Sequence, residues 1–338
     1  MSQADVPVSV LDTSPIVQGS TARAALHNTV DLARLADELG YHRYWVPEHH
    51  GMRGVASAAT AVIVGRIADA TQRIRVGAGG ILLPNHAPII IAEQFGTLEA
   101  LHPQRIDLGI GRALGGSLRT AELVRSERER TAKTFPEQLD ELLGYFDPHG
   151  NDTPHAVPAA GNRPPLWILG SSDVSGQLAG SLGLPYAFAH HLNADGAAAA
   201  TRLYRTSFQP SPQCLSPRIL ISVSVIAAQT DERAEWLAGS TRLKVLSRIR
   251  GRRILLPSPD HAASYPYTED DRTQIAAQSS GVLVGSPDTV RKALQNLLHT
   301  TQAHELMVTT PVYDHHDRRR SYEFISDLAC TLQPIATT

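Results

Sequence analysis

The residues best suited to chemistry follow short apolar runs of the chain. Glu48, His49 and His50 come directly after the run 44–47, and His190 and His191 follow the run 186–189. Imidazole and carboxylate groups can accept or donate protons near neutral pH, as general acid–base catalysis requires. Because successive side chains of a strand point to opposite faces, we expect one histidine of each pair to enter a site. A purely structural histidine, hydrogen-bonded to Glu48 or to a main-chain carbonyl, is the alternative for His49.

A Gly-Ser-Ser turn suggests phosphate binding. Gly170, Ser171 and Ser172 lie between an apolar run and a helical pattern, with Ser175 one turn further on. Free N–H groups at a helix N-terminus, supplemented by hydroxyls, form a site for a phosphate dianion. Arg112, which follows the run 106–110, could add two charged hydrogen bonds. The alternative stays open that Ser172 only caps the helix and that Arg112 meets a surface carboxylate.

We predict neither a metal site nor a Rossmann-type dinucleotide site. A metal-dependent hydrolase of the expected architecture often carries His-x-His on its first strand, whereas the end of that run here, residues 11–14, has no histidine. Gly109, Gly111 and Gly115 are spaced one residue too far apart for the G-x-G-x-x-G fingerprint. The glycines at 77, 79 and 80 lie inside an apolar run that continues as a strand instead of opening a helix.

Alternating strands and helices must position these residues. Helical patterns separate apolar runs that have the length and composition of strands. The predicted strands are residues 6–11, 44–47, 74–83, 106–110, 166–169, 186–189, 219–227 and 306–309. The capping box of Thr134 and Glu137 and the pair Ser286-Pro287 mark two helix starts. Such a chain forms either a closed (β/α)8 barrel or an open parallel sheet, and periodicity alone does not choose between them.

A single domain, residues 1–338, accounts for the whole sequence. Single (β/α)8 barrels run from about 200 to more than 400 residues, so the length needs no second domain. Residues 248–282 are rich in Arg, Pro, Ser and Asp and have no clean period, which predicts an inserted excursion before the last helices.

Composition excludes several classes of function. The chain has 31 Lys and Arg against 33 Asp and Glu, so no basic field is available for a nucleic acid. No apolar run approaches the roughly 20 residues of a membrane span, and we expect a cytoplasmic protein. Cys214 and Cys330 are too few for a disulfide framework or a thiolate metal site.

At this point the chain resembles the bacterial-luciferase-like flavin-dependent monooxygenases, in particular the subgroup that begins with Leu-Asp-x-Ser-Pro. The resemblance covers nearly the whole chain, and an ordered set of motifs of this size is highly specific. The matching stretches are Leu11-Asp12-Thr13-Ser14-Pro15 and residues 40–50, 74–77, 83–84, 105–112, 169–172, 183–189 and 305–308.

The resemblance implies a TIM-type (β/α)8 barrel with FMN across the carboxyl ends of its strands. It implies that His49 is catalytic, supported by Glu48 and His50, and that Gly79 and Gly80 form a cis peptide bond under the flavin ring. The residues expected to contact the cofactor are Gly79, Gly80, Gly111, Arg112, Gly170, Ser171, Ser172 and Ser175. Pro47 and the pair Ala58-Ala59 depart from the family pattern, which bears on the substrate side of the pocket.

The expected activity is that of a two-component monooxygenase. A separate NAD(P)H:flavin reductase would supply FMNH2, O2 would be the co-substrate, and the missing dinucleotide fingerprint agrees with this division of labour. The alternatives are an oxidoreductase of the same superfamily that uses the deazaflavin F420, and a flavin-binding relative that has lost catalysis. The substrate, a small organic molecule, is not identified by the sequence, and a role in secondary metabolism follows only by analogy.

A homodimer is the expected assembly. The predicted second helix is apolar on nearly all sides, so it needs cover beyond its barrel side. Its apolar residues are Ala58, Ala59, Ala61, Val62, Ile63, Val64, Ile67 and Ala68.

Overall fold

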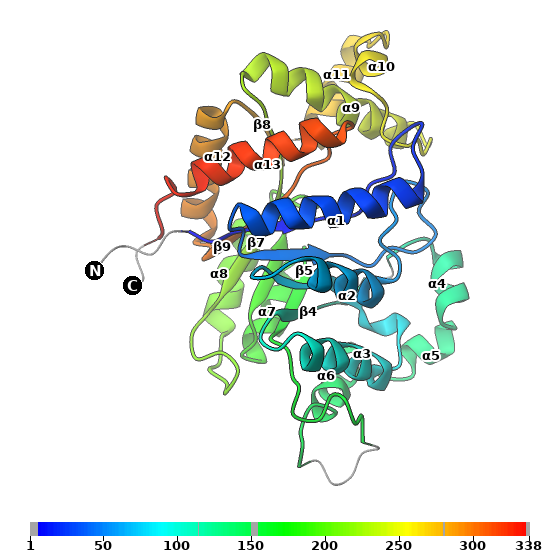
Figure 1. Cartoon of the computed structure of the whole chain (residues 1–338), viewed down its shortest axis with the longest axis vertical. Coiled ribbons are helices and arrows are strands. Elements are labelled where there is room, and N and C mark those ends of the chain that lie inside the picture. Colours follow the sequence, from blue (N-terminus) through cyan, green and yellow to red (C-terminus); the bar gives the residue numbers. More distant parts are fainter. Residues whose placement is uncertain (1–5, 114, 150–154, 280, 336–338) are drawn as a thin grey trace.

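The computed structural model describes residues 6–113, 115–149, 155–279 and 281–335, and its parallel strands close into a TIM-type barrel (Figure 1). Each strand pairs with the next from β1 to β7, and β9 pairs with both β7 and β1, which closes the ring. The strands of the barrel are β1 (Val8–Leu11), β2 (Arg43–Val46), β3 (Arg75–Leu82), β4 (Ile106–Gly111), β5 (Leu166–Gly170), β6 (Tyr186–Ala189), β7 (Ile219–Ala227) and β9 (Glu305–Thr309). The predicted barrel, and not the open sheet, is therefore confirmed.

Helices surround the barrel and cover the outward side chains of the strands (Figure 1). The predicted start signals are confirmed, since Thr134 forms a capping box with Glu137 and Pro287 opens the helix that follows Ser286. The helices are α1 (Ala22–Glu38), α2 (Thr60–Ala70), the 3-10 turn η1 (Leu83–Asn85), α3 (Pro88–Leu101), α4 (Leu118–Val124), α5 (Glu127–Thr131), α6 (Phe135–Gly144), α7 (Asp173–Ser181), α8 (Ala197–Ser207), α9 (Asp231–Ile249), α10 (Pro259–Ala263), α11 (Glu269–Gln278), α12 (Pro287–Thr301) and α13 (His315–Ala329).

The described residues contain a ninth strand that the sequence analysis did not predict. β8 (Val282–Gly285) pairs with the last four residues of β7, beyond the part of β7 that pairs with β6. β8 is only four residues long and follows a polar segment, so the sequence pattern did not distinguish it as a strand. Only its first residue, Val282, lies within the predicted excursion. That excursion holds the end of α9, then α10, α11 and the start of β8; Ser280, within it, lies outside the described residues.

The barrel interior has a charged layer at the amino ends of the strands. Arg43 donates from Nη1 to Asp107 at 2.7 Å and from Nε to Glu305 at 2.8 Å, and Ser9 donates to Glu305 at 2.6 Å. Burial by itself raises the pKa of Asp107, but the charges of Arg43 and Arg75 outweigh it and the pKa is lowered. The charged and polar groups of this buried layer therefore satisfy one another through hydrogen bonds and ion pairs.

An apolar layer lies above the charged one. The rings of Trp45 and Trp167 meet edge to face, with centroids 5.6 Å apart, and Trp45 Nε1 donates to Asp107 below at 3.1 Å. The other members of this layer are Leu11, Ala187, Leu220 and Met307. Two bulky aromatic rings fill the centre of the barrel, so any cavity must lie above them, at the carboxyl ends of the strands.

α2 is less apolar on its outer face than its sequence suggested. Ile63, Val64 and Ile67 are buried against the barrel, whereas Arg66 and Asp69 are exposed. Across the described residues no helix combines the length and the apolar character needed to cross a membrane.

Candidate active site

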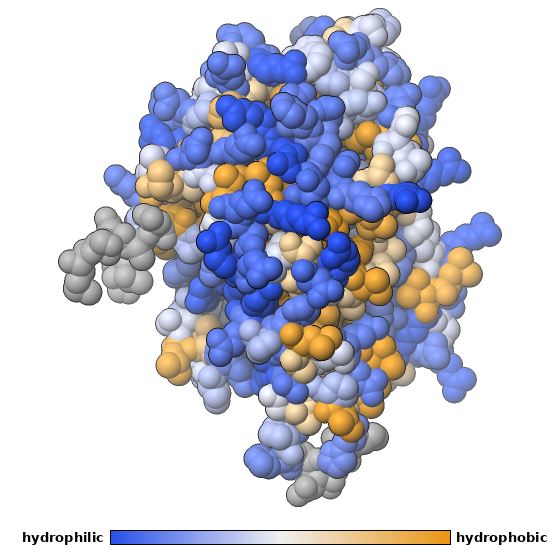
Figure 2. Space-filling model, viewed as in Figure 1, coloured by the Kyte–Doolittle hydropathy of each residue, from blue (hydrophilic) through white to orange (hydrophobic). Residues whose placement is uncertain are grey.

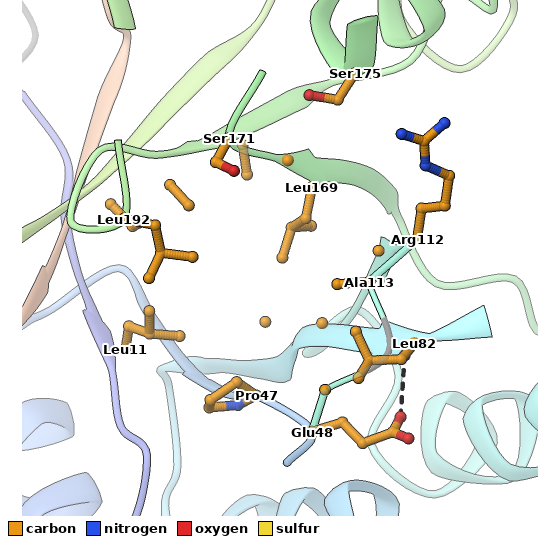
Figure 3. A pocket seen from close by; sticks show the side chains of 18 of the residues that line it. Leu11, Pro47, Glu48, Leu82, Arg112, Ala113, Leu169, Ser171, Ser175 and Leu192 are labelled. Carbon is orange, nitrogen blue, oxygen red and sulfur yellow. Dashed lines mark hydrogen bonds between the residues drawn. The ribbon is translucent and has the colours of Figure 1, made fainter. Parts of the chain in front are cut away.

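A cavity of about 570 Å³ opens at the carboxyl ends of the strands. Its floor is the apolar layer of the barrel, through Leu11, Trp45 and Met307, and its rim is formed by the loops that follow β1, β2, β4, β5 and β6. In Figure 3 Arg112 and Ser175 lie toward one side of the cavity, and Leu11 and Leu192 lie toward the other. The cavity thus has one polar side and one apolar side.

Gly79 and Gly80 form part of the cavity wall and are joined by a cis peptide bond, as the resemblance implied. A Cβ on Gly79 would lie 2.9 Å from Leu11 and from Trp45, and a Cβ on Gly80 would lie 2.7 Å from the carbonyl oxygen of Gly109. Side chains here would clash with the barrel interior. The pair therefore presents bare backbone to the cavity, which leaves room for a flat ring to lie against it.

Glu48 is the centre of a buried cluster of hydrogen bonds. Its carboxylate accepts from His50 Nε2 at 2.6 Å, from His86 Nε2 at 2.8 Å and from the Leu82 N–H at 3.0 Å, the last drawn in Figure 3. Burial by itself raises the pKa of Glu48, but the bonds and charge of His86, together with the Leu82 and His50 bonds, lower it overall. Glu48 is therefore an ionised acceptor that positions its neighbours.

The same cluster has the composition of a cation site. Ligand atoms of Glu48, His50 and His86 lie within 4.8 Å of one another. In the structure the carboxylate oxygens accept three hydrogen bonds instead, which accounts for the geometry without an ion. That the site holds no metal stays a prediction.

His49 lines the cavity, whereas His50 does not. The main-chain N–H of His49 donates to the Ser57 carbonyl at 2.8 Å, which fixes the backbone, but Nδ1 is buried without a hydrogen-bond partner in the described part of the chain. Burial is the main cause that lowers the pKa of His49, with Glu48 opposing it and His50 adding to it. At neutral pH His49 is therefore a neutral imidazole, and its buried Nδ1 is satisfied by no described residue.

The Gly170-Ser171-Ser172 turn lies where the sequence placed it, between β5 and α7. A Cβ on Gly170 would lie 2.0 Å from Ser175 Oγ, so the turn closes only with glycine. Ser175 Oγ donates to the Ser172 carbonyl at 2.6 Å and lies 2.9 Å from the Tyr186 hydroxyl. Ser175 therefore holds the turn, while Ser171 and Ser172 line the cavity and Ser172 is also the N-cap residue of α7.

Arg112 completes this polar side. Its guanidinium points to the Ser175 side of the cavity in Figure 3, and it makes no ion pair or hydrogen bond with the described residues. An unpaired guanidinium beside a helix N-terminus fits a phosphate. The surface carboxylate considered as its alternative partner is not found among the described residues.

The structure brings together all but one of the residues predicted for the site. His50 alone stays outside the cavity and acts on it through Glu48. The predicted residues that line the cavity are Glu48, His49, Gly79, Gly80, Gly111, Arg112, Gly170, Ser171, Ser172 and Ser175.

Residues 7–305 match the model of the luciferase-like monooxygenase family. The chain belongs to the luciferase-like monooxygenases. It is 46% identical over 326 residues to YvbT of Bacillus subtilis, covering 96% of this chain and 97% of that one. It is 42% identical over 330 residues to a luciferase-like monooxygenase of Escherichia coli K12 (97% and 98%), and 31% identical over 330 residues to the N-acetyl-S-alkylcysteine monooxygenase of Bacillus subtilis (95% and 98%).

Solved structures agree with this membership. The crystal structure of apo-MsnO8 superposes on this luciferase-like monooxygenase with a TM-score of 0.89 at 38% identity, over 98% of this chain and 100% of that one. The oxygenating component of 3,6-diketocamphane monooxygenase from Pseudomonas putida, solved with FMN, has a TM-score of 0.73 at 17% identity, over 99% and 100%. At that identity the likeness shows a shared fold.

One histidine of the second pair, His191, lines the cavity as expected, whereas a further cavity residue of this luciferase-like monooxygenase, Lys244, was not predicted. His191 Nδ1 lies 2.9 Å from Ser222 Oγ, and burial, as the largest cause, lowers the pKa of His191 to about 4. Its place in a His-His pair at a strand end was the available signal, and only one member of that pair, like one of the first pair, lines the cavity. Lys244 reaches the cavity from α9, where the sequence does not distinguish it from an exposed lysine.

Proposed function

We propose that this luciferase-like monooxygenase binds FMNH2 in the cavity and uses O2 to oxidise a small organic substrate. The observation that carries the proposal is the pairing, in one cavity, of a phosphate-type site with a bare-backbone wall. Arg112 and the Ser171-Ser172 turn supply the first, and the cis-bonded glycines 79 and 80 supply the second. A flavin mononucleotide has one phosphate and one flat ring system, which correspond to these two parts.

The residues of the chain would bind and orient the cofactor and the substrate, and they would exclude water from the cavity. FMN supplies the redox chemistry when it is bound. The apolar floor around Trp45 excludes water from below, which strengthens every electrostatic contact in the cavity. His49, neutral and with Nδ1 unpartnered, would exchange or hold one proton beside the ring, and Glu48 would keep the His50 and His86 side chains in place.

We propose that a separate NAD(P)H:flavin reductase supplies the reduced cofactor. The glycines at 109, 111 and 115 lack the spacing of a dinucleotide fingerprint, so the chain has no evident means of taking electrons from a nicotinamide. The relative named N-acetyl-S-alkylcysteine monooxygenase supports a small organic substrate. A place in secondary metabolism is proposed by analogy alone.

Anaerobic titration tests the cofactor. The purified protein is titrated with photoreduced FMN and, in parallel, with reduced F420, and binding is followed by the change in absorbance and protein fluorescence. We expect FMNH2 to bind with a dissociation constant in the micromolar range or lower. When oxygenated buffer is mixed in, the oxidation rate of bound FMNH2 should differ from that of free FMNH2. Tighter binding of reduced F420, without oxygen-dependent chemistry, would favour the deazaflavin oxidoreductase instead. Binding of FMNH2 with no turnover of any substrate in a broad screen would favour a relative that has lost catalysis.

A further inference from the structure

Lys244 is a cation of the cavity wall with no partner among the described residues. It lines the cavity from α9, and it makes no hydrogen bond or ion pair with any residue that the structure describes. Burial is the main cause that lowers the pKa of Lys244, and the positive charge of Arg248 adds to it. A partly buried ammonium without a counterion is unfavourable unless a ligand supplies the negative charge.

Lys244 reaches the cavity from elements other than those that carry the phosphate-type site. Its Nζ is 3.6 Å from the point that a Cβ on Gly54 would occupy, and Gly54 belongs to the loop after β2. That loop is bonded to the loop after β1, through the Ala56 N–H to the Ser14 carbonyl at 2.9 Å. Arg112 follows β4 and the serine turn follows β5, whereas Lys244 belongs to α9, which follows β7, and meets the loop after β2.

The cavity therefore presents two unpaired cations at two places. One phosphate of a bound flavin, placed at Arg112 and the serine turn, would leave Lys244 available to a second anion. Much of the remaining cavity lining is apolar and includes Met52, Val55 and Leu192. A ligand for this side needs one negative charge and an apolar body.

We propose that Lys244 is the anion-recognition residue for the substrate, and that the substrate is a small carboxylic acid whose apolar part lies on the Leu11, Met52 and Met307 side of the cavity. This rests on the proposed function, since it assigns the Arg112 side to the cofactor. A single ammonium, with no guanidinium fork and no helix N-terminus beside it, suits the single charge of a carboxylate better than the double charge of a phosphate.

Binding of matched acids and alcohols to the FMN-loaded protein tests the proposal. Octanoate and phenylacetate are compared by calorimetry with 1-octanol and 2-phenylethanol, which have the same apolar bodies without the charge. We expect at least one acid to bind roughly tenfold or more tightly than its alcohol, the range for a hydrogen bond to a charged group. In Lys244→Gln this ratio should fall to about one, and in Lys244→Arg most of it should remain, while the alcohols bind all three proteins alike.

Arg248→Gln is the matched control. It removes the same charge from the same helix, but Arg248 is exposed and does not line the cavity, so the acid-to-alcohol ratio should stay within about twofold of the unmodified protein. Melting curves establish that every variant is folded.

Several outcomes would overturn the inference: no preference for either acid, a preference that survives in Lys244→Gln, or an equal loss in Arg248→Gln. A loss of FMN affinity in Lys244→Gln would assign the residue to the cofactor and would equally overturn it. The same titrations on the FMN-free protein separate this inference from the proposed function. Failure to bind FMN would refute the proposed function, whereas the acid preference of the FMN-free protein still decides whether Lys244 selects an anion.

Discussion

Neighbouring residues of the Glu48-His49-His50 segment have different roles because their surroundings differ. Glu48 is buried but accepts three hydrogen bonds, so it remains ionised. His49 is buried with few compensating contacts, so its neutral form is favoured. His50 is satisfied by Glu48 and lies outside the cavity. Burial and hydrogen bonding, more than residue type, decide which of the three can act on a ligand.

We expect Arg112→Ala to weaken FMN binding by about 1.5 to 3 kcal/mol, the range for a hydrogen bond to a charged group. The guanidinium is unpaired among the described residues, so its loss should cost the phosphate contact and little stability. Flavin fluorescence quenching measures the dissociation constant. Arg128→Ala, an exposed arginine of α5 outside the cavity, is the control. Unchanged FMN affinity at low salt would contradict the assignment.

We expect His49→Ala to keep the fold and most FMN affinity but to lose product formation by about 10²- to 10⁴-fold, the usual range for acid–base assistance. Reduced flavin should then be oxidised wastefully to hydrogen peroxide. Because burial lowers the pKa of His49, the wild-type activity should fall only below the ordinary imidazole range, as the ring becomes protonated. Stopped-flow oxidation, a peroxide assay and a product assay with a screened substrate measure these effects. A variant that melts earlier yet stays fully coupled would show that His49 is only structural.

Protonation of His191 should lower the free energy of unfolding as the pH falls. Its pKa of about 4 in the folded chain lies below the ordinary 6.5, so the unfolded chain binds a proton first as the pH falls. The stabilisation is present above pH 6.5 and is lost as the pH falls through about 4. In His191→Gln the decline of unfolding free energy over this window should be shallower by up to about 1.4 kcal/mol per pH unit. Urea denaturation at several pH values measures it, with the exposed His27→Gln as control; equal slopes in wild type and His191→Gln would contradict the prediction.

At the scale of elements, short turns and strand ends place the site, and buried ion pairs hold the strands in register. Gly170 lets β5 turn sharply into α7, and the glycines of β3 let the backbone form the cavity wall. Arg43 of β2 reaches Asp107 of β4 and Glu305 of β9 beneath the cavity floor. The same charged layer thus connects strands from different parts of the chain.

We expect Glu305→Ala to destabilise the fold by about 3 kcal/mol, because it removes one carboxylate from Arg43 and the acceptor of Ser9 in a buried layer. Glu323→Ala, which breaks the exposed pair with Arg320, should change the free energy of unfolding by less than about 0.5 kcal/mol. Urea denaturation of both variants gives the comparison. The charged layer would not be stabilising if the two variants proved equally stable.

At the scale of the molecule, we propose that the protein is a homodimer that uses the outer face of α2. Val62 is 73% exposed on this face, and Ala58 and Ala59 precede it on the surface. Figure 2 shows the face that carries α1, α2 and α3, where separate apolar patches lie among hydrophilic side chains. Arg66 and Asp69 make this face mixed, which is typical of the rim of an interface.

Light scattering at micromolar concentration should give twice the mass of the chain, and Val62→Arg should shift it toward the monomer. Leu215→Arg, at an exposed position after β6 and α8, should leave the mass unchanged. A monomeric wild type would remove the proposal, and a Val62→Arg dimer would place the interface elsewhere.

The sequence predicted the barrel strands well because nearly all of their residues are buried, so apolar side chains predominate on both faces of each strand. β8 was missed since four residues at the end of a polar segment carry too little pattern. The histidines and serines of the site were predicted because they come directly after strands, whose ends meet at one edge of the barrel, whereas Gly79 and Gly80, inside β3, were implied by the family resemblance. Lys244 could not be predicted in this way. It is a residue of α9 that meets the loop after β2, and a contact between residues so far apart in the chain leaves no pattern in the sequence around Lys244.

What the sequence by itself determined is the set of strands and helices, the family, and the residues able to bind a phosphate or exchange a proton. These follow from local patterns and from the chemistry of single side chains. Only the tertiary structure decided that His49 lines the cavity while His50 supports Glu48, that Ser175 holds the turn, and that Lys244 lines the cavity without a partner among the described residues. Such properties depend on distances between residues far apart in the chain, and those distances exist only once the barrel has closed.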